Sequence, residues 1–438
     1  MRSGSFALAA LALMAAAACG RSGLDREALV EPATCEGCHG DHVREWAGSM
    51  HAYASDDPVF RAMNRLGQRL TGGALGDFCV RCHAPVAVAE GLTADGLDLD
   101  DVPTAKRGVT CVACHQVAEV TALHNGGLSW TQDDVMFGGL DEAQETGAHR
   151  SAYSELVDGS ASASSDMCGA CHDVRGAGGL AVESTYAEWA GSVFADPVSG
   201  VSCAGCHLPG RDGEASRGGP IRRVHDHRMA AVDVALTPWP DLDGQLAAID
   251  RDLNGVLSSR LCVYPTGGGV RVEVVLDNIL AGHAFPSGVT HARRAWVELR
   301  AEEAGVVTFE RGNFAAGEIV TATGDTWVLG SRFLDDNGAA VEHVWDARAI
   351  ESQLLGPAVT RDASDPRFYH AQTRTWFVAG VPDRITMGVR LEAVGLDVLD
   401  VLIAEGELDP AVRARIPRHA LRGTSREWRR DRDGVCAP

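Results

Sequence analysis

Ten cysteines and five histidines recur in one arrangement, Cys-x-x-Cys-His, between residues 35 and 207. Two thiols at this spacing can form thioether bonds to the vinyl groups of a haem, and the adjacent imidazole then becomes the proximal iron ligand. Zinc knuckles and redox dithiols do not need a histidine directly after the second cysteine five times. The pattern therefore predicts five covalently bound c-type haems, each with its iron. The motifs comprise Cys35, Cys38 and His39; Cys79, Cys82 and His83; Cys111, Cys114 and His115; Cys168, Cys171 and His172; and Cys203, Cys206 and His207.

The sixth position on each iron decides the chemistry, because the motif supplies only the proximal ligand. A second histidine there makes a low-potential electron carrier, whereas a vacant or water-filled position permits substrate chemistry. Eleven histidines lie outside the motifs, and six of them lie in the haem region, which is enough for five distal ligands. The candidate distal ligands are His51, His124, His149, His225, His227 and His283.

Other residues near the motifs have competing interpretations. His42 is so close to His39 that we expect it to face solvent or a haem propionate. Met50 and Met229 are alternative axial ligands, less expected where histidines are abundant. His283 lies in a Gly- and Pro-containing loop, where it either reaches an iron or propionate or belongs to a buried structural turn. We expect the remaining downstream histidines at the surface, namely His291, His343, His370 and His419.

The N-terminal residues are typical of a targeting segment. An apolar run from Phe6 to Ala18 is too short for a confident membrane span and indicates a signal peptide. Cys19 follows three alanines, as in a bacterial lipoprotein box, so we expect a lipid on Cys19; ordinary cleavage near it is the alternative. The expected location is the periplasm, with anchoring to the outer membrane as a lipoprotein.

Two further cysteines, Cys262 and Cys436, would meet an oxidising environment after export. They predict one disulfide between the extreme C-terminus and the start of a second domain. Such a long closed loop contributes about 3–5 kcal/mol in the chain-entropy model. Two unrelated buried thiols are the alternative.

The charge balance restricts the partners. The chain has 438 residues and a formal net charge of −21, and two propionates on each haem add to that charge. So acidic a protein is not expected to bind nucleic acid, whose phosphates attract basic surfaces. Redox proteins or quinol-linked cytochromes are the expected partners, and the oligomeric state is left open.

The pattern along the chain changes from haem motifs to strands after the Pro-rich segment 237–241. Alternating apolar residues at 270–276, 297–301 and 385–391 predict strands with one buried face. The expected fold class is α + β and multidomain: a loop-rich, mainly α haem region, an antiparallel β-sandwich and a short C-terminal helical segment. That segment begins with a helix over 396–404, and a second helix follows Asp409-Pro410. The expected segments are a signal peptide (1–19), a flexible linker (20–34), a pentahaem domain (35–236), a linker (237–257), a β-sandwich (258–395), and C-terminal helices and tail (396–438).

A short segment occurs twice in the haem region. Glu45-Trp46-Ala47-Gly48-Ser49 recurs as Glu188-Trp189-Ala190-Gly191-Ser192, and Gly-Val-Thr-Cys before the third motif recurs as Gly-Val-Ser-Cys before the fifth. This repeat indicates that a haem-binding module was duplicated.

These motifs resemble those of exported multihaem cytochromes c, in the group that contains the tetrahaem electron-transfer cytochrome of ammonia oxidisers and hydroxylamine oxidoreductase. The resemblance covers residues 31–230, through C-x-x-C-H…E-W-x-x-S-x-H-A and the later motifs. The loop A-G-H-x-F-P-x-G resembles part of a β-domain appended to some multihaem cytochromes. The resemblance implies closely stacked haems, mostly with two histidine ligands, and His51 as one distal ligand. Phe194 stands at the equivalent position of the second copy, so that copy needs another ligand.

Three functions follow from these observations. The favoured one is an electron carrier with five haems, mostly ligated by two histidines, without substrate chemistry. The second is a haem-dependent oxidoreductase acting on a small nitrogen or sulfur compound at one open iron, for which Phe194 is the best indication. The third is a structural subunit of a multihaem electron conduit, docked through its β-domain.

Overall fold

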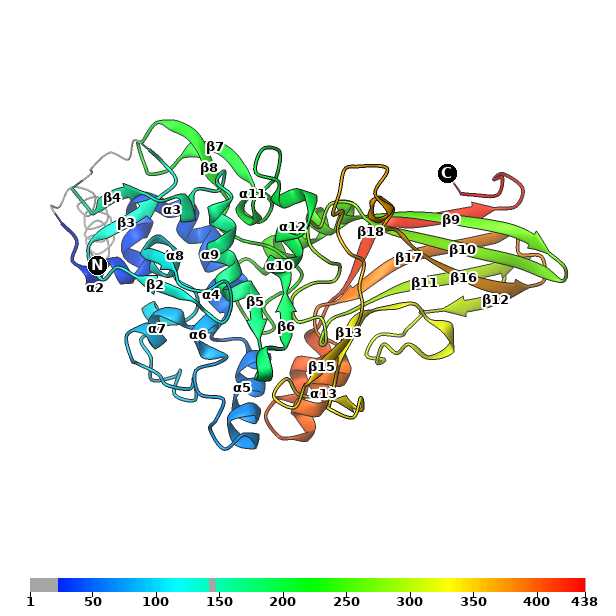
Figure 1. The fold of residues 1–438 in the computed structure, drawn as a ribbon, viewed down its shortest axis with the longest axis horizontal. Helices are drawn as coiled ribbons and strands as arrows, with labels where there is room; N and C mark the ends of the chain where they lie inside the picture. The colour runs from blue at the N-terminus through cyan, green and yellow to red at the C-terminus, as the bar shows by residue number, and fades with distance from the viewer. Residues whose placement is uncertain (1–22, 142–146, 438) are drawn as a thin grey trace, which may run out of the picture. The chain divides into compact units, whose positions relative to one another are not determined.

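The computed structural model describes residues 23–141 and 147–437 (Figure 1). The expected signal peptide and Cys19 lie outside these residues. The chain forms two compact units. Of the described residues, the first unit comprises 23–141, 147–171, 200–230 and 237–245, and the second comprises 172–199, 231–236 and 246–437.

The first unit is built from short helices joined by loops, as expected for a region in which haem replaces part of the core. Small apolar clusters form around Phe60 and Val80, and around Val86 and Val112. Several helices start at a residue whose side chain caps them: Ser49 and Asp57 each accept a hydrogen bond from a backbone N–H of the first turn. The elements are α2 (Arg26–Val30), α3 (Pro32–Ala47), α4 (Met50–Tyr53), α5 (Pro58–Leu70), α6 (Val80–His83), α7 (Pro85–Ala89), η1 (Thr104–Lys106), α8 (Cys111–His115), η2 (Glu155–Val157), α9 (Ala163–His172, whose last residue belongs to the second unit) and α11 (Cys203–His207).

Three two-stranded sheets complete the first unit and position distal candidates. His149 directly precedes one strand, and His225 ends another. The pairs are β1 (Val117–Val120) with β2 (Leu128–Trp130), β3 (Val135–Gly138) with β4 (Arg150–Tyr153) in parallel, and β7 (Gly210–Glu214) with β8 (Ile221–His225).

The second unit is dominated by two antiparallel sheets (Figure 1). One sheet has the order β16-β10-β9, and the other β14-β13-β11-β17-β18, with β12 on β11 and β15 on β13. The buried faces carry the predicted alternation, for example Val270, Val272, Val274 and Leu276 in β10. The strands are β9 (Leu257–Thr266), β10 (Gly269–Asn278), β11 (Arg294–Glu303), β12 (Val306–Arg311), β13 (Val328–Leu334), β14 (Ala340–Val341), β15 (Ala349–Gln353), β16 (Gln372–Ala379), β17 (Arg384–Glu392) and β18 (Arg418–Arg429).

The expected α + β fold class is confirmed, and so is the helix over 396–404, which is α13 (Leu396–Ala404). The short helix after Asp409 is η7 (Pro410–Arg415), with Asp409 as its cap. The expected tail after this helix contains the strand β18, which extends the sheet against β17. A bulge opposite Met387 and Val389 interrupts the alternation of buried residues in β18. Because this alternation is the sequence signal of a strand, β18 was not predicted.

Two expected boundaries also differ from the packing. The linker at 237–257 contains the helix α12 (Leu242–Val256), whose residues Ile249 and Leu253 are buried one turn apart. Residues 172–199 belong to the second unit rather than to a haem domain ending at 236. They form β5 (Asp173–Arg175), η3 (Ala177–Gly179), β6 (Ala181–Ser184), α10 (Thr185–Ala190) and η4 (Val193–Ala195). Val182 of β6 packs with Phe333 of β13, which explains this assignment.

Cys262 of β9 and Cys436 form the expected disulfide, 174 residues apart in sequence. Among the described residues, none lies in a helix that is long and apolar enough to cross a membrane.

Candidate haem sites

Eight of the attachment cysteines lie in or next to helices of at most 10 residues, whereas Cys35 and Cys38 lie in the longer helix α3. Nine of the ten are free thiols. Cys38 is disulfide-bonded, and a thioether at this position requires that bond to be absent. Burial raises the pKa of Cys79 to about 12 and that of Cys114 to about 11. These thiols are therefore protonated at neutral pH and face an apolar environment, as attachment points for a porphyrin would.

Cysteines of different motifs touch. Hydrogen bonds between thiols join Cys35 to Cys111, Cys82 to Cys171, and Cys168 to Cys203. The first motif therefore lies beside the third, and the fourth lies beside both the second and the fifth. Groups attached through touching thiols must be close neighbours, which agrees with the stacked haems that the resemblance implies.

Four proximal imidazoles are oriented by backbone carbonyl groups. The Nδ1 atoms of His39, His83, His115 and His207 lie 2.6, 3.0, 2.7 and 2.9 Å from the carbonyl oxygens of Ala215, Ala54, Phe137 and Ala230. A ring that donates its Nδ1–H in this way keeps the lone pair of Nε2 for a metal. In contrast, Nδ1 of His172 lies 3.6 Å from the carboxylate of Glu183.

Two pairs of imidazoles fit a six-coordinate haem iron. A metal–nitrogen bond is about 2 Å, and a ring centroid lies roughly 1.1 Å beyond the bonding nitrogen, so two imidazoles on one iron have centroids about 6.3 Å apart. The ring centroids of His39 and His149 are 6.3 Å apart, and those of His115 and His227 are also 6.3 Å apart. The residues present therefore fit haem at the first and third motifs, with His149 and His227 as partners.

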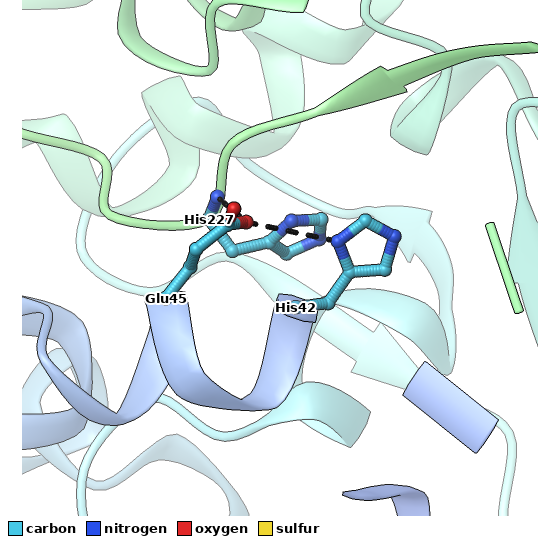
Figure 2. A group of neighbouring side chains, drawn as sticks. All are labelled: His42, Glu45 and His227. Carbon is cyan, nitrogen blue, oxygen red and sulfur yellow. Dashed lines mark hydrogen bonds and ion pairs between the residues drawn. The ribbon is translucent and has the colours of Figure 1, made fainter. Parts of the chain in front are cut away.

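His42 also lies 6.3 Å from His39 between ring centroids, but it cannot share an iron with it. Both residues belong to α3, three positions apart, so the helix backbone would have to pass through the porphyrin disc. His42 instead joins a cluster with Glu45 and His227 (Figure 2). Of the two expected surroundings of His42, solvent or a haem propionate, the structure does not show the first, and the second stays a prediction.

Glu45 is the centre of that cluster and is 3 % exposed. Its carboxylate accepts the backbone N–H of His227 at 3.1 Å and lies 3.7 Å from Nδ1 of His42 (Figure 2). It also accepts a guanidinium N–H of Arg211 at 2.8 Å. Burial alone would raise the pKa of Glu45, but His42, Arg211 and the N–H of His227 together lower it to about 2. Glu45 is therefore a buried anion at neutral pH. Its place in the repeated segment is the only sign in the sequence of a role for this residue.

Three distal candidates occupy different surroundings. His51 lies in α4, and its carbonyl accepts the N–H of Val109 at 2.8 Å. His124 is exposed in a turn. His225 directs Nδ1 to the carbonyl of Leu208 at 2.7 Å, the arrangement that frees Nε2.

His283 lies in a loop of the second unit beside the position where the repeat lacks a histidine. A Cβ on Gly282 would lie 3.5 Å from the ring of Phe194. Nδ1 of His283 lies 2.8 Å from the carbonyl of Ala284, as in the oriented imidazoles above.

The expectation that the downstream histidines are surface residues is wrong for His291 and His370. The ring of His291 packs 4.1 Å from that of Phe333, and its Nδ1 is buried. Nε2 of His370 lies 3.0 Å from Asp277.

Repeated haem-attachment motifs on short helices, with imidazoles oriented for iron, define a multihaem c-type cytochrome. Residues 34–116 match the family described as cytochrome c554 and c-prime, so the resemblance is confirmed for this part of the chain. The fold is similar to that of a penta-heme cytochrome c552 from Thermochromatium tepidum, with a TM-score of 0.61 and 18 % identity. The similarity covers 91 % of this chain and 98 % of that chain. No curated protein matches the sequence.

Proposed function

We propose that the protein is an electron carrier with five haems, in which most irons have two histidine ligands. The observation that carries this proposal is the separation of 6.3 Å between the rings of His39 and His149 and between those of His115 and His227. Each haem would supply a one-electron Fe(III)/Fe(II) couple. The chain's own contribution is to hold imidazoles on both faces of the iron and to exclude exogenous ligands.

In this proposal the remaining distal ligands come from His51, His124, His225 and His283. His225 and His283 each direct Nδ1 to a carbonyl, so Nε2 is the nitrogen that would bind an iron. The touching thiols of neighbouring motifs support transfer along adjacent haems, because each attachment site has a neighbour in direct contact.

The test uses the purified full chain: its mass gives the number of haems, and carbon monoxide binding after reduction detects any iron with an open position. We expect the protein mass to include five haems, and we expect no carbon monoxide difference spectrum after full reduction, because every iron is six-coordinate. A mass with fewer haems would contradict the count. A spectral change equivalent to one haem or more would contradict full ligation.

An enzymatic function is the second candidate, and Phe194 at the position of a histidine in the repeat favours it. It requires one iron to bind carbon monoxide when reduced and a small nitrogen or sulfur compound in turnover. The same spectrum therefore decides between the carrier and the oxidoreductase.

We also propose that the protein works in the periplasm, attached to the outer membrane by a lipid on Cys19, and exchanges electrons with redox proteins. The support is the apolar run before Cys19 and the acidity of the chain. Mass spectrometry of the mature N-terminal peptide tests the lipid: an acylated Cys19 is expected, and an unmodified N-terminus would exclude this anchor.

A further inference from the structure

The repeated Glu-Trp-Ala-Gly-Ser segment has the same local structure in both copies, one in each unit. In both, a helix ends at the glycine, and the serine N–H bonds to the tryptophan carbonyl, at 2.8 Å for Ser49 and 2.9 Å for Ser192. Both serines then cap the next helix through a backbone N–H. The two glutamates, Glu45 and Glu188, therefore occupy equivalent positions on their helices.

In the first copy, the glutamate binds the backbone of a loop that carries a distal candidate. Glu45 accepts the N–H of His227 itself at 3.1 Å. The ring of the same residue lies 6.3 Å from that of His115, the separation that a shared iron requires.

In the second copy, the glutamate also binds a loop that carries a histidine. Glu188 accepts the N–H of Ala284, which directly follows His283, at 3.1 Å, and the hydroxyl of Ser287 at 2.6 Å. The hydroxyls of Thr185 and Ser287 are 2.9 Å apart, which holds the loop to the same helix, α10.

We propose that the glutamate of each copy is a positioning residue for a distal haem ligand: Glu45 for His227 and Glu188 for His283. The proposal rests on the proposed ligation of iron by two histidines. A histidine on a loop stays bonded to iron only if the loop backbone is held at the right distance from that iron. A carboxylate can hold it, because a carboxylate acceptor makes a stronger hydrogen bond to an N–H than a neutral group does. In the second copy, His283 in the loop after β10 thus corresponds to His227 of the first copy, whereas the position of His51 is occupied by Phe194.

The experiment uses the full, haem-loaded chain with four alanine variants: Glu45→Ala, Glu188→Ala, His227→Ala and His283→Ala. For each, the carbon monoxide difference spectrum of the reduced protein and the high-spin ferric signal in electron paramagnetic resonance are measured. We expect each glutamate variant to gain carbon monoxide binding at one haem, with the same spectrum as its histidine partner. The double variant of each pair should gain no second site.

Conservative variants separate positioning from general destabilisation. Glutamine keeps an oxygen acceptor, so Glu45→Gln and Glu188→Gln should stay mostly low-spin, whereas Glu45→Asp and Glu188→Asp, which are one methylene shorter, should gain partial carbon monoxide binding. Glu119→Ala, an exposed carboxylate of β1, is the matched control and should leave the spectra unchanged. If an alanine variant does not accumulate, the aspartate variant gives the answer.

Two outcomes would overturn different claims. If the histidine variants open an iron but the glutamate variants stay low-spin without carbon monoxide binding, the positioning role is wrong and the ligation stands. If His227→Ala and His283→Ala leave every iron six-coordinate, the proposed ligation itself is wrong at these haems.

Discussion

In each proximal histidine, Nδ1 is the ring nitrogen that does not bind iron. The group that accepts a hydrogen bond from Nδ1 sets the orientation of the ring and also affects the reduction potential of the iron. Four of the five rings meet a neutral backbone carbonyl, whereas Nδ1 of His172 faces Glu183 at 3.6 Å. The side chain of Glu183 is 14 % exposed. A carboxylate partner makes the imidazole more basic and stabilises Fe(III) over Fe(II).

This difference predicts that Glu183→Gln raises the midpoint potential of the haem on His172. We expect a shift on the order of 59 mV, a tenfold change in a one-electron equilibrium. Spectroelectrochemical titration of the five haems measures it, with Glu119→Gln as the control. Unchanged potentials at all haems would show that Glu183 does not act on this iron.

A histidine outside the candidate haem ligands predicts a pH dependence of stability. Burial, together with Arg294 and Arg293, lowers the pKa of His291 to about 3. Between its ordinary pKa of 6.5 and 3, the unfolded chain binds a proton at this site that the folded chain does not. The free energy of unfolding therefore falls as the pH falls through this window, and above it the contribution of His291 is independent of pH.

Replacing His291 with leucine removes this proton uptake. Urea unfolding at pH 7 and pH 5 should show that the wild type loses about 2 kcal/mol more than His291→Leu over this range. His343→Leu, which removes a ring next to Trp345, is the control. Equal pH dependence in the wild type and in His291→Leu would show that His291 is protonated in the folded state.

At the scale of elements, most helices that carry motifs are shorter than a helix that is stable alone; α8 and α11 have five residues each. Thioether bonds and iron ligation would therefore contribute to their stability. The sheet unit is different, because long strands with alternating buried residues form its core, and a disulfide ties its C-terminal segment to β9.

The disulfide predicts a measurable stabilisation of the sheet unit. The double variant Cys262→Ser/Cys436→Ser should lose about 3–5 kcal/mol of unfolding free energy, because the open chain gains conformational entropy when unfolded. Thermal unfolding followed by circular dichroism measures the loss. A reductant should lower the melting temperature of the wild type by more than that of the double variant. An equal fall in both would show that the bond between Cys262 and Cys436 does not contribute, and that reduction acts elsewhere, at Cys38 or at the haem irons.

At the scale of the whole molecule, the two units have different folds but share one local arrangement of residues. Each contains a copy of the Glu-Trp-Ala-Gly-Ser segment, and in each the glutamate binds a loop with a histidine. The histidine-carrying segment that the glutamate binds therefore comes from different elements: it follows β8 in the first copy and β10 in the second.

The sequence by itself determined the cofactor class, the strand faces and the disulfide. The cofactor class and the strand faces depend on local spacing: two thiols and an imidazole within five residues, and alternation along a strand. The short helix at 396–404 was predictable for the same reason, since Gly406 ends it in the left-handed conformation. The disulfide follows from counting, because Cys262 and Cys436 are the two cysteines that remain after the motifs and Cys19.

Only the tertiary structure decided which imidazoles meet, which motifs are neighbours, and where the units divide. His39 and His149 are 110 positions apart, and no local pattern relates them; their 6.3 Å separation results from how loops pack. The strand β18 was hidden because a bulge breaks the period on which sequence reading depends. The role of Glu45 and Glu188 was hidden because each acts on a backbone N–H, which every residue except proline has and which no sequence pattern marks.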